Sequence, residues 1–75
     1  MKIKVKLFAS LRIQIGKKEV DLNISGHEKV RDIITLLNLS ENDNFITMIN
    51  GVHCQMDHQL NEGDVLSIFP MIAGG

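Results

Sequence analysis

The stretch Val65-Leu66-Ser67-Ile68-Phe69-Pro70-Met71-Ile72-Ala73-Gly74-Gly75 joins an apolar strand directly to a small, uncharged tail. The residues before Pro70 have the β-branched and aromatic character that is typical of a strand. Pro70 lacks the N–H that would continue a hydrogen-bonded ladder, so we expect the strand to stop there. Residues 70–75 are then expected to form a flexible tail.

The two terminal glycines are the most informative feature of that tail. Glycine has no Cβ, so it adds nothing to a core and allows another protein's surface to approach the backbone closely. An attack on the terminal carbonyl needs reacting atoms about 3–3.5 Å apart, which a bulky last side chain would obstruct. We therefore expect Ile72, Ala73 and Gly74 to thread a narrow channel, and the α-carboxylate of Gly75 to be the reactive group.

Three segments before residue 65 predict a hairpin and a turn. Phe45–Ile49 is apolar and β-branched, and Val52–Cys54 is a short return strand. The dipeptide Asn50-Gly51 between them is the one favoured by a type I′ hairpin turn. Leu60–Asp64, with its Gly63, predicts a tight turn that leads into the last strand.

The N-terminal half predicts an opening pair of strands. Residues 2–7 alternate between lysine and an apolar residue, which is the period-2 pattern of a half-buried strand. Gly16-Lys17-Lys18 predicts a turn, and Glu19–Ile24 alternates again. These two segments are therefore expected to form a hairpin.

A helix is predicted after the second strand. Ser25-Gly26-His27-Glu28 has the S-x-x-E form of a capping box, which marks the start of a helix. Apolar residues then recur at helical spacing, which predicts two to three turns on one amphipathic face. They are Val30, Ile33, Ile34 and Leu37. The polar run from Asn38 to Asn44 is expected to end this helix.

The resulting order is β-β-α-β-β-β, which makes the fold class α+β. One helix would pack on a mixed sheet of four to five strands, with the first and last strands parallel in the middle because crossovers are right-handed. This is the β-grasp arrangement. Residues 1–75 are read as a single β-grasp domain, because 75 residues bury only about 60% of their unfolded surface.

Composition places the chain among ordinary cytoplasmic domains. It is 44% hydrophobic and 23% charged, and its single cysteine, Cys54, cannot form an internal disulfide. No apolar run approaches the roughly 20 residues of a membrane-spanning helix. The alternating N-terminus lacks the apolar region of a signal peptide. We therefore expect a cytoplasmic protein with no membrane partner.

Charge is unevenly distributed along the chain. All eight basic residues lie within the first 31 positions, whereas six of the nine acidic residues follow them. Nucleic acid is not expected as a partner, because no aromatic residues interleave with the basic ones as a stacking platform would require. The lysines are expected to form the solvated face of one strand. The acidic second half is expected to guide docking onto a basic partner.

Several segments together resemble a known family. They are Leu7-Phe8-Ala9-Ser10-Leu11-Arg12, Val30-Arg31-Asp32-Ile33, Ile49-Asn50-Gly51, Leu60–Asp64 and Ile68–Gly75. The chain resembles, over essentially its whole length, the MoaD/ThiS-type ubiquitin-like sulfur carriers, most closely the small subunit of molybdopterin synthase (MoaD). One departure is that the molybdopterin-type ending usually has two prolines after the phenylalanine, whereas here Pro70 is followed by Met71.

The resemblance implies a carrier that holds no cofactor and has no catalytic groups of its own. An E1-like enzyme of the MoeB/ThiF type would use ATP to form an adenylate at Gly75, and a sulfur donor would convert it to a thiocarboxylate (1-thioglycine). The large subunit of molybdopterin synthase (MoaE type) would accept this sulfur for the molybdenum or tungsten cofactor. The alternatives are a carrier for thiazole synthase in thiamine synthesis, a protein modifier conjugated through Gly75, and an adaptor with an inert tail.

An exposed sheet face is the expected docking surface for these partners. Phe8 continues the first strand on its lysine side, and Phe69 points the same way if Leu66 and Ile68 face the helix. Exposed aromatic and methionine side chains are typical of interfaces. The expected partner-binding residues are Phe8, Met48, His53, Phe69 and Met71, although the sequence leaves the orientation of Met48 and His53 open.

Cys54 is the residue type most easily mistaken for a catalytic group. As a nucleophile it would need His53 or His58 as a base, but neighbouring residues in a strand point to opposite faces. A metal site at these three residues lacks both the spacing and a fourth ligand. We therefore expect Cys54 to be a small buried hydrophobe, and no metal to be bound.

Overall fold

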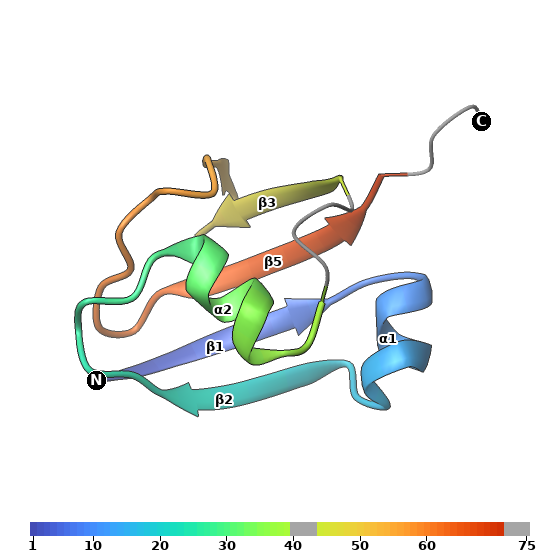
Figure 1. Cartoon of the computed structure of the whole chain (residues 1–75), viewed down its shortest axis with the longest axis horizontal. Coiled ribbons are helices and arrows are strands. Elements are labelled where there is room, and N and C mark those ends of the chain that lie inside the picture. The colour runs from blue at the N-terminus through green and yellow to red at the C-terminus, as the bar shows by residue number, and fades with distance from the viewer. Residues whose placement is uncertain (40–43, 72–75) are drawn as a thin grey trace.

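A computed structural model describes residues 1–39 and 44–71, and these form one mixed sheet with two helices (Figure 1). The elements are β1 (Lys2–Leu7), α1 (Ser10–Ile15), β2 (Glu19–Asn23), α2 (Val30–Leu36), β3 (Phe45–Ile49), β4 (Val52–His53) and β5 (Val65–Pro70). The five strands lie in the order β2-β1-β5-β3-β4, and α2 lies across one face of the sheet.

The first and last strands are neighbours in the middle of the sheet. β1 and β5 run parallel, with Lys4 opposite Val65 and Leu7 opposite Ile68. The pairs β1–β2, β3–β5 and β3–β4 are antiparallel. This arrangement confirms the predicted β-grasp fold, including the parallel central pair.

Strict alternation along the central strands separates a covered face from an open one. In β5, Leu66 and Ile68 are fully buried, whereas their neighbours are half exposed. The covered face contacts α2 through the helical stripe that the sequence predicts. The fully or almost fully buried side chains are Ile3, Val5, Leu7, Val30, Ile33, Ile34, Leu60, Leu66 and Ile68. Burial of such side chains contributes about 1.5–3 kcal/mol each before the entropy cost of folding.

The sequence interpretation missed the helix α1, which lies between β1 and β2. Leu11 is buried and Ile15 is half-buried, so a two-residue stripe at i, i+4 seals the end of the core. Gly16 ends the helix in the left-handed conformation (φ 86°) and donates its N–H to the carbonyl of Arg12 (2.8 Å). The three apolar residues Leu11, Ile13 and Ile15 alternate with polar ones at period 2, so the sequence shows no helical period here.

The start of α2 differs from the predicted one. The Ser25–Glu28 hydrogen bonds do form, since the carboxylate of Glu28 accepts the N–H of Ser25 at 3.0 Å. They close a loop, however, and the helix begins only at Val30. The residue that caps it is Asp32, whose carboxylate accepts the N–H of Lys29 (2.8 Å).

The hairpin between β3 and β4 follows the sequence prediction. Asn50 and Gly51 both have positive φ, 52° and 83°, as a type I′ turn requires. The side chain of Asn50 also ties the turn to the start of β5, because its amide donates to Asp64 (3.1 Å) and its oxygen accepts the N–H of Val65 (3.0 Å). Asp64 is buried and accepts a second hydrogen bond from the N–H of Asn61 (2.9 Å).

The last strand is one residue longer than predicted. Pro70 still pairs with Phe45 in the ladder, and the N–H of Met71 donates to the carbonyl of Asn44 (3.0 Å). A proline blocks only its own N–H, so the backbone on either side of it can continue the pairing. β5 thus holds the chain in the sheet up to the point where the tail begins.

Candidate functional site

Two phenylalanines form a stacked pair at the end of β5. The rings of Phe8 and Phe69 lie with their centroids 4.2 Å apart and their planes 14° from parallel. Both side chains are half-buried, although they lie on the sheet face away from α2. The structure therefore confirms that Phe8 and Phe69 share the face predicted for them.

An unusual backbone turn holds Phe8 in this position. Ala9 has φ 52° and ψ −131°, the geometry of the first central residue of a type II′ turn, which normally is glycine. The turn is closed by a hydrogen bond from the N–H of Leu11 to the carbonyl of Phe8 (3.1 Å). Such a conformation costs an alanine on the order of 1–3 kcal/mol. Strain of this kind often occurs at functional sites, and here it is adjacent to the aromatic pair.

Arg12 completes the group on the other side of Phe8. Its Cζ lies 5.2 Å from the centroid of the Phe8 ring, within the range of a cation–π contact. Its Nε–H donates to the carbonyl of Leu7 (2.8 Å). We call Arg12, Phe8 and Phe69 the aromatic–arginine cluster.

The strand register places further predicted residues on the same face. Ile46 is opposite Phe69, and Met48 is opposite both Ser67 and His53. Directly paired residues point to the same side of a sheet, so Met48 and His53 both lie on the face that carries the cluster. We call this side of the sheet, away from α2, the outer face. His53 is exposed at the edge strand, whereas Met48 and Ile46 are half-buried.

The chain leaves the sheet beside this cluster. Met71 is 50% exposed and immediately follows β5. The predicted threading residues and the predicted reactive carboxylate lie outside the described residues. They are Ile72, Ala73, Gly74 and Gly75. A partner that binds the tail would also contact the surface around Met71 and the aromatic–arginine cluster.

Charged side chains of both signs lie on the outer face along β1 and β2. Lys2, Lys4 and Lys6 point to this side, opposite Asn23, Asp21 and Glu19 of β2. Lys4 lies 3.6 Å from Glu19, a largely exposed ion pair that contributes at most about 1 kcal/mol.

The described acidic residues of the second half serve mostly local roles. Asp32 caps α2, Asp64 is buried in the turn, and Glu62 accepts the backbone N–H of Lys2. The prediction that the acidic second half guides docking stays a prediction, because Glu41 and Asp43 lie outside the described residues.

The candidate nucleophile Cys54 has a packing role in the structure. It is half-buried against the core, and its Sγ lies 3.5 Å from the hydroxyl of the buried Thr47. His53 is on the opposite face, as predicted. Within residues 1–39 and 44–71, no three His, Cys, Asp or Glu side chains are grouped so that they could hold a metal ion.

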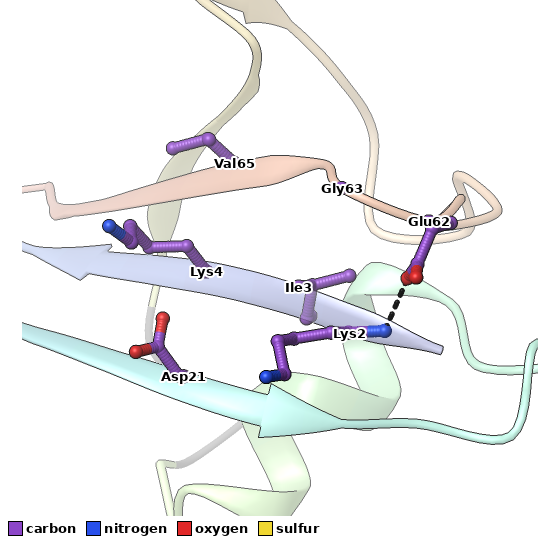
Figure 2. Close-up of a pocket in the computed structure, with 7 residues that line it drawn as sticks. All are labelled: Lys2, Ile3, Lys4, Asp21, Glu62, Gly63 and Val65. Carbon is purple, nitrogen blue, oxygen red and sulfur yellow. Dashed lines mark hydrogen bonds between the residues drawn. The ribbon is translucent and has the colours of Figure 1, made fainter.

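A shallow cavity of about 370 Å³ lies at the other end of the sheet (Figure 2). Figure 2 shows its lining residues Lys2, Ile3, Lys4, Asp21, Glu62, Gly63 and Val65, drawn around the start of β1 and of β5. Val65 begins β5 and Pro70 ends it, so the cavity is about 17 Å along the strand from the tail. The cavity therefore lies at the opposite end of β5 from the point where the tail begins.

Within the part of the chain that the structure describes, one ionisable group is strongly perturbed, and it lies in the loop before α2. Hydrogen bonds from the backbone N–H and the hydroxyl of Ser25 lower the pKa of Glu28 from 4.5 to about 2. The Ser25 hydroxyl donates to Oε1 of Glu28 at 2.8 Å. Glu28 is a structural carboxylate, since it closes a loop on the helix side of the sheet.

Sequence reasoning missed two residues of the outer face, Ile46 and Arg12. Arg12 follows Phe8 by four positions within the quoted motif, but Phe8 precedes α1, so helical spacing does not predict their contact. The fold and its central parallel pair together define a ubiquitin-like β-grasp domain.

Comparison with known proteins agrees with this class. The model of the ThiS family matches residues 5–75, and the chain belongs to that family. Its structural neighbours are carriers of the ThiS/MoaD type. No match was found among proteins with curated descriptions. No helix of the described residues is long and apolar enough to cross a membrane.

Three solved structures are similar over nearly the whole chain. A Pyrococcus furiosus protein described provisionally as molybdopterin converting factor, subunit 1, is 27% identical, with a TM-score of 0.80 over 96% of this chain and 99% of that one. Small archaeal modifier protein 1 from Methanosarcina acetivorans is 25% identical, with a TM-score of 0.77 over 99% and 96%. A chain from the complex of subunits 1 and 2 of molybdopterin-converting factor from Helicobacter pylori shares the fold at 18% identity, with a TM-score of 0.66 over the full length of both.

Proposed function

We propose that this protein is a sulfur carrier that acts as the small subunit of molybdopterin synthase. An E1-like enzyme of the MoeB/ThiF type adenylates the carboxylate of Gly75 with ATP. A donor persulfide then displaces AMP and forms an acyl disulfide with the terminal carbonyl. A second thiol of the donor cleaves this acyl disulfide, so that a C-terminal thiocarboxylate is released and the donor becomes a disulfide. The sulfur of the thiocarboxylate is transferred to a pterin precursor in the large subunit, a protein of the MoaE type. The family match through residue 75 is the observation that carries this proposal.

The geometry of the outer face supports a carrier that docks on its partners before the tail reacts. Phe69 is the last residue but one of β5, so a partner that encloses the tail also covers Phe8 and Phe69. Met48 and His53 extend the same surface, and Met71 begins the segment beyond it. Holding the carboxylate near the attacking group by such docking raises its effective concentration.

The second candidate is a protein modifier joined to lysine side chains through Gly75. The similarity to a small archaeal modifier protein favours it, at 25% identity over 99% of this chain. Thiazole synthesis is the remaining alternative, since the matched family carries the name of the thiamine-pathway carrier. All three functions use the same activated terminus, and they differ in the acceptor.

Intact-mass measurement of the protein from its native host tests the proposal. Replacement of one terminal oxygen by sulfur is the expected result, and removal of Gly75 should abolish it. Conjugates of higher mass linked to lysine would favour the modifier. Co-purification identifies the pathway, because recovery of a thiazole synthase in place of a pterin-binding large subunit would overturn the molybdopterin assignment.

A further inference from the structure

We propose that Arg12 is a preformed cationic anchor that binds an acidic side chain of the adenylating enzyme where the tail leaves the sheet. The inference rests on the proposed function, because it assigns the partner that activates Gly75. It adds a residue and a charge requirement to a surface that is otherwise apolar at this end.

The first argument is that the side chain of Arg12 is already held in place. Its Nε–H is bound to the carbonyl of Leu7 at 2.8 Å, and its Cζ lies 5.2 Å from the centroid of Phe8. Immobilising a flexible arginine on binding costs conformational entropy, so a side chain that is fixed beforehand loses less. The planar guanidinium can bind a carboxylate through two parallel hydrogen bonds, which an ammonium cannot do.

The second argument is the position of Arg12. It is joined through Phe8 to Phe69, and Phe69 is followed by Pro70 and the exposed Met71. An enzyme that closes around the tail must therefore pass close to the guanidinium. An apolar contact at Phe8 and Phe69 would exclude water from a neighbouring ion pair, which strengthens it.

The third argument is charge. Lys4 and Lys6 lie on the outer face next to β5, but Asp21 and Glu19 of β2 stand opposite them and balance their charge. Arg12 forms no salt bridge with any acidic side chain of the described residues, so its charge is not balanced in this way. The matching group on the enzyme is thus one carboxylate opposite Arg12. The attraction between the two charges also accelerates association at low ionic strength.

The test measures adenylation of the full-length chain by the host's own E1-like enzyme, as a function of carrier concentration. Arg12→Glu is expected to raise KM for the carrier about tenfold or more and to leave kcat unchanged. Arg12→Lys should give an intermediate increase, because it keeps the charge and loses the planar fork. Arg31→Glu is the matched control. Arg31 is exposed on α2, on the other side of the sheet. The KM for the Arg31→Glu carrier should therefore stay within about twofold of the wild-type value.

Two further measurements keep the result interpretable. Thermal unfolding shows whether Arg12→Glu still folds. Lys6→Glu reverses a second charge on the outer face and leaves the side chains of Arg12 and Phe8 unchanged. Increasing NaCl from about 50 to about 500 mM should raise the wild-type KM more than that of Arg12→Glu.

The outcomes separate the two proposals. A wild-type chain that is adenylated, together with an unchanged KM for Arg12→Glu or, where that variant does not fold, for Arg12→Lys, would overturn the anchor and leave the carrier function standing. A wild-type chain that is never adenylated would overturn the carrier function and the anchor with it.

Discussion

The two faces of the sheet differ in almost every respect although they share the same five strands. The covered face is made of aliphatic side chains such as Val5 and Ile68, which are fully buried under α2. The outer face carries lysines, an aromatic pair and half-exposed apolar residues, and no described element packs over it. Alternation within a single strand thus assigns stability to one side and recognition to the other. Predicted effects of substitution follow this division.

The largest effect on stability is expected on the covered face. Ile68→Ala removes a fully buried side chain from the central strand and should lower the free energy of unfolding by about 2–5 kcal/mol. For a chain of this size that is much of the total, and urea denaturation measures it. Ser67→Ala, one residue away on the outer face, is the matched control. Similar losses in the two variants would show that the faces are not distinct.

A smaller loss is expected for the aromatic pair of the outer face. Phe69→Ala removes the stacking on Phe8, and we expect a stability loss of about 1–2 kcal/mol together with a strong loss of adenylation. Urea denaturation and the adenylation assay together compare the two effects. A stability loss as large as that of Ile68→Ala would place Phe69 in the core, and unchanged adenylation would remove it from the docking surface.

The strained turn before α1 should respond in the opposite direction. Ala9→Gly places at φ 52° and ψ −131° the one residue that adopts this conformation without strain. The relief exceeds the added entropy of the unfolded glycine, so we expect stability to increase by about 0.5–1 kcal/mol. Thermal unfolding measures the change. A decrease would mean that Ala9 is not strained.

The smallest effect is expected in the loop that leads from the sheet to α2, and it depends on pH. The pKa of Glu28 is lowered from 4.5 to about 2 in the folded protein by its hydrogen bonds from Ser25. The ionised carboxylate therefore stabilises the fold above about pH 4.5, and this contribution is lost as the pH falls from there toward 2. Glu28→Gln should reduce the difference between urea midpoints at pH 7 and about pH 3. An unchanged difference would contradict the assignment.

Much of the fold could be predicted because its strands carry strong local signals. The alternation of residues 2–7 and the Asn50-Gly51 dipeptide each predict one structure, and both occur. Two helix boundaries were harder. α1 has only Leu11 and Ile15 as an apolar stripe, and the capping-box pattern at Ser25 stands five residues before the helix. Short helices gain their stability from tertiary packing, which a local pattern does not contain.

The residues of the candidate site were predictable only where the alternation of side chains along a strand decides which face of the sheet a residue lies on. The parallel pairing of β1 with β5 places Phe8 beside Phe69, and this follows from alternation. The orientation of Met48 and His53 depends on the register of the hairpin, which the two-residue turn sets. The position of the Arg12 side chain depends on the backbone at Ala9, where an L-residue has positive φ. No residue preference predicts that conformation, so the contact with Phe8 could not be derived from the sequence.

The position of β5 has a consequence for the order in which the molecule is built. This strand is synthesised after all the others, yet it lies between β1 and β3 and is hydrogen-bonded to both. A nascent chain that stops short of residue 65 has two separate hairpin halves and no sheet to join them. Folding of the domain therefore cannot be completed before β5 leaves the ribosome, because closure of the sheet must await the strand that precedes the tail.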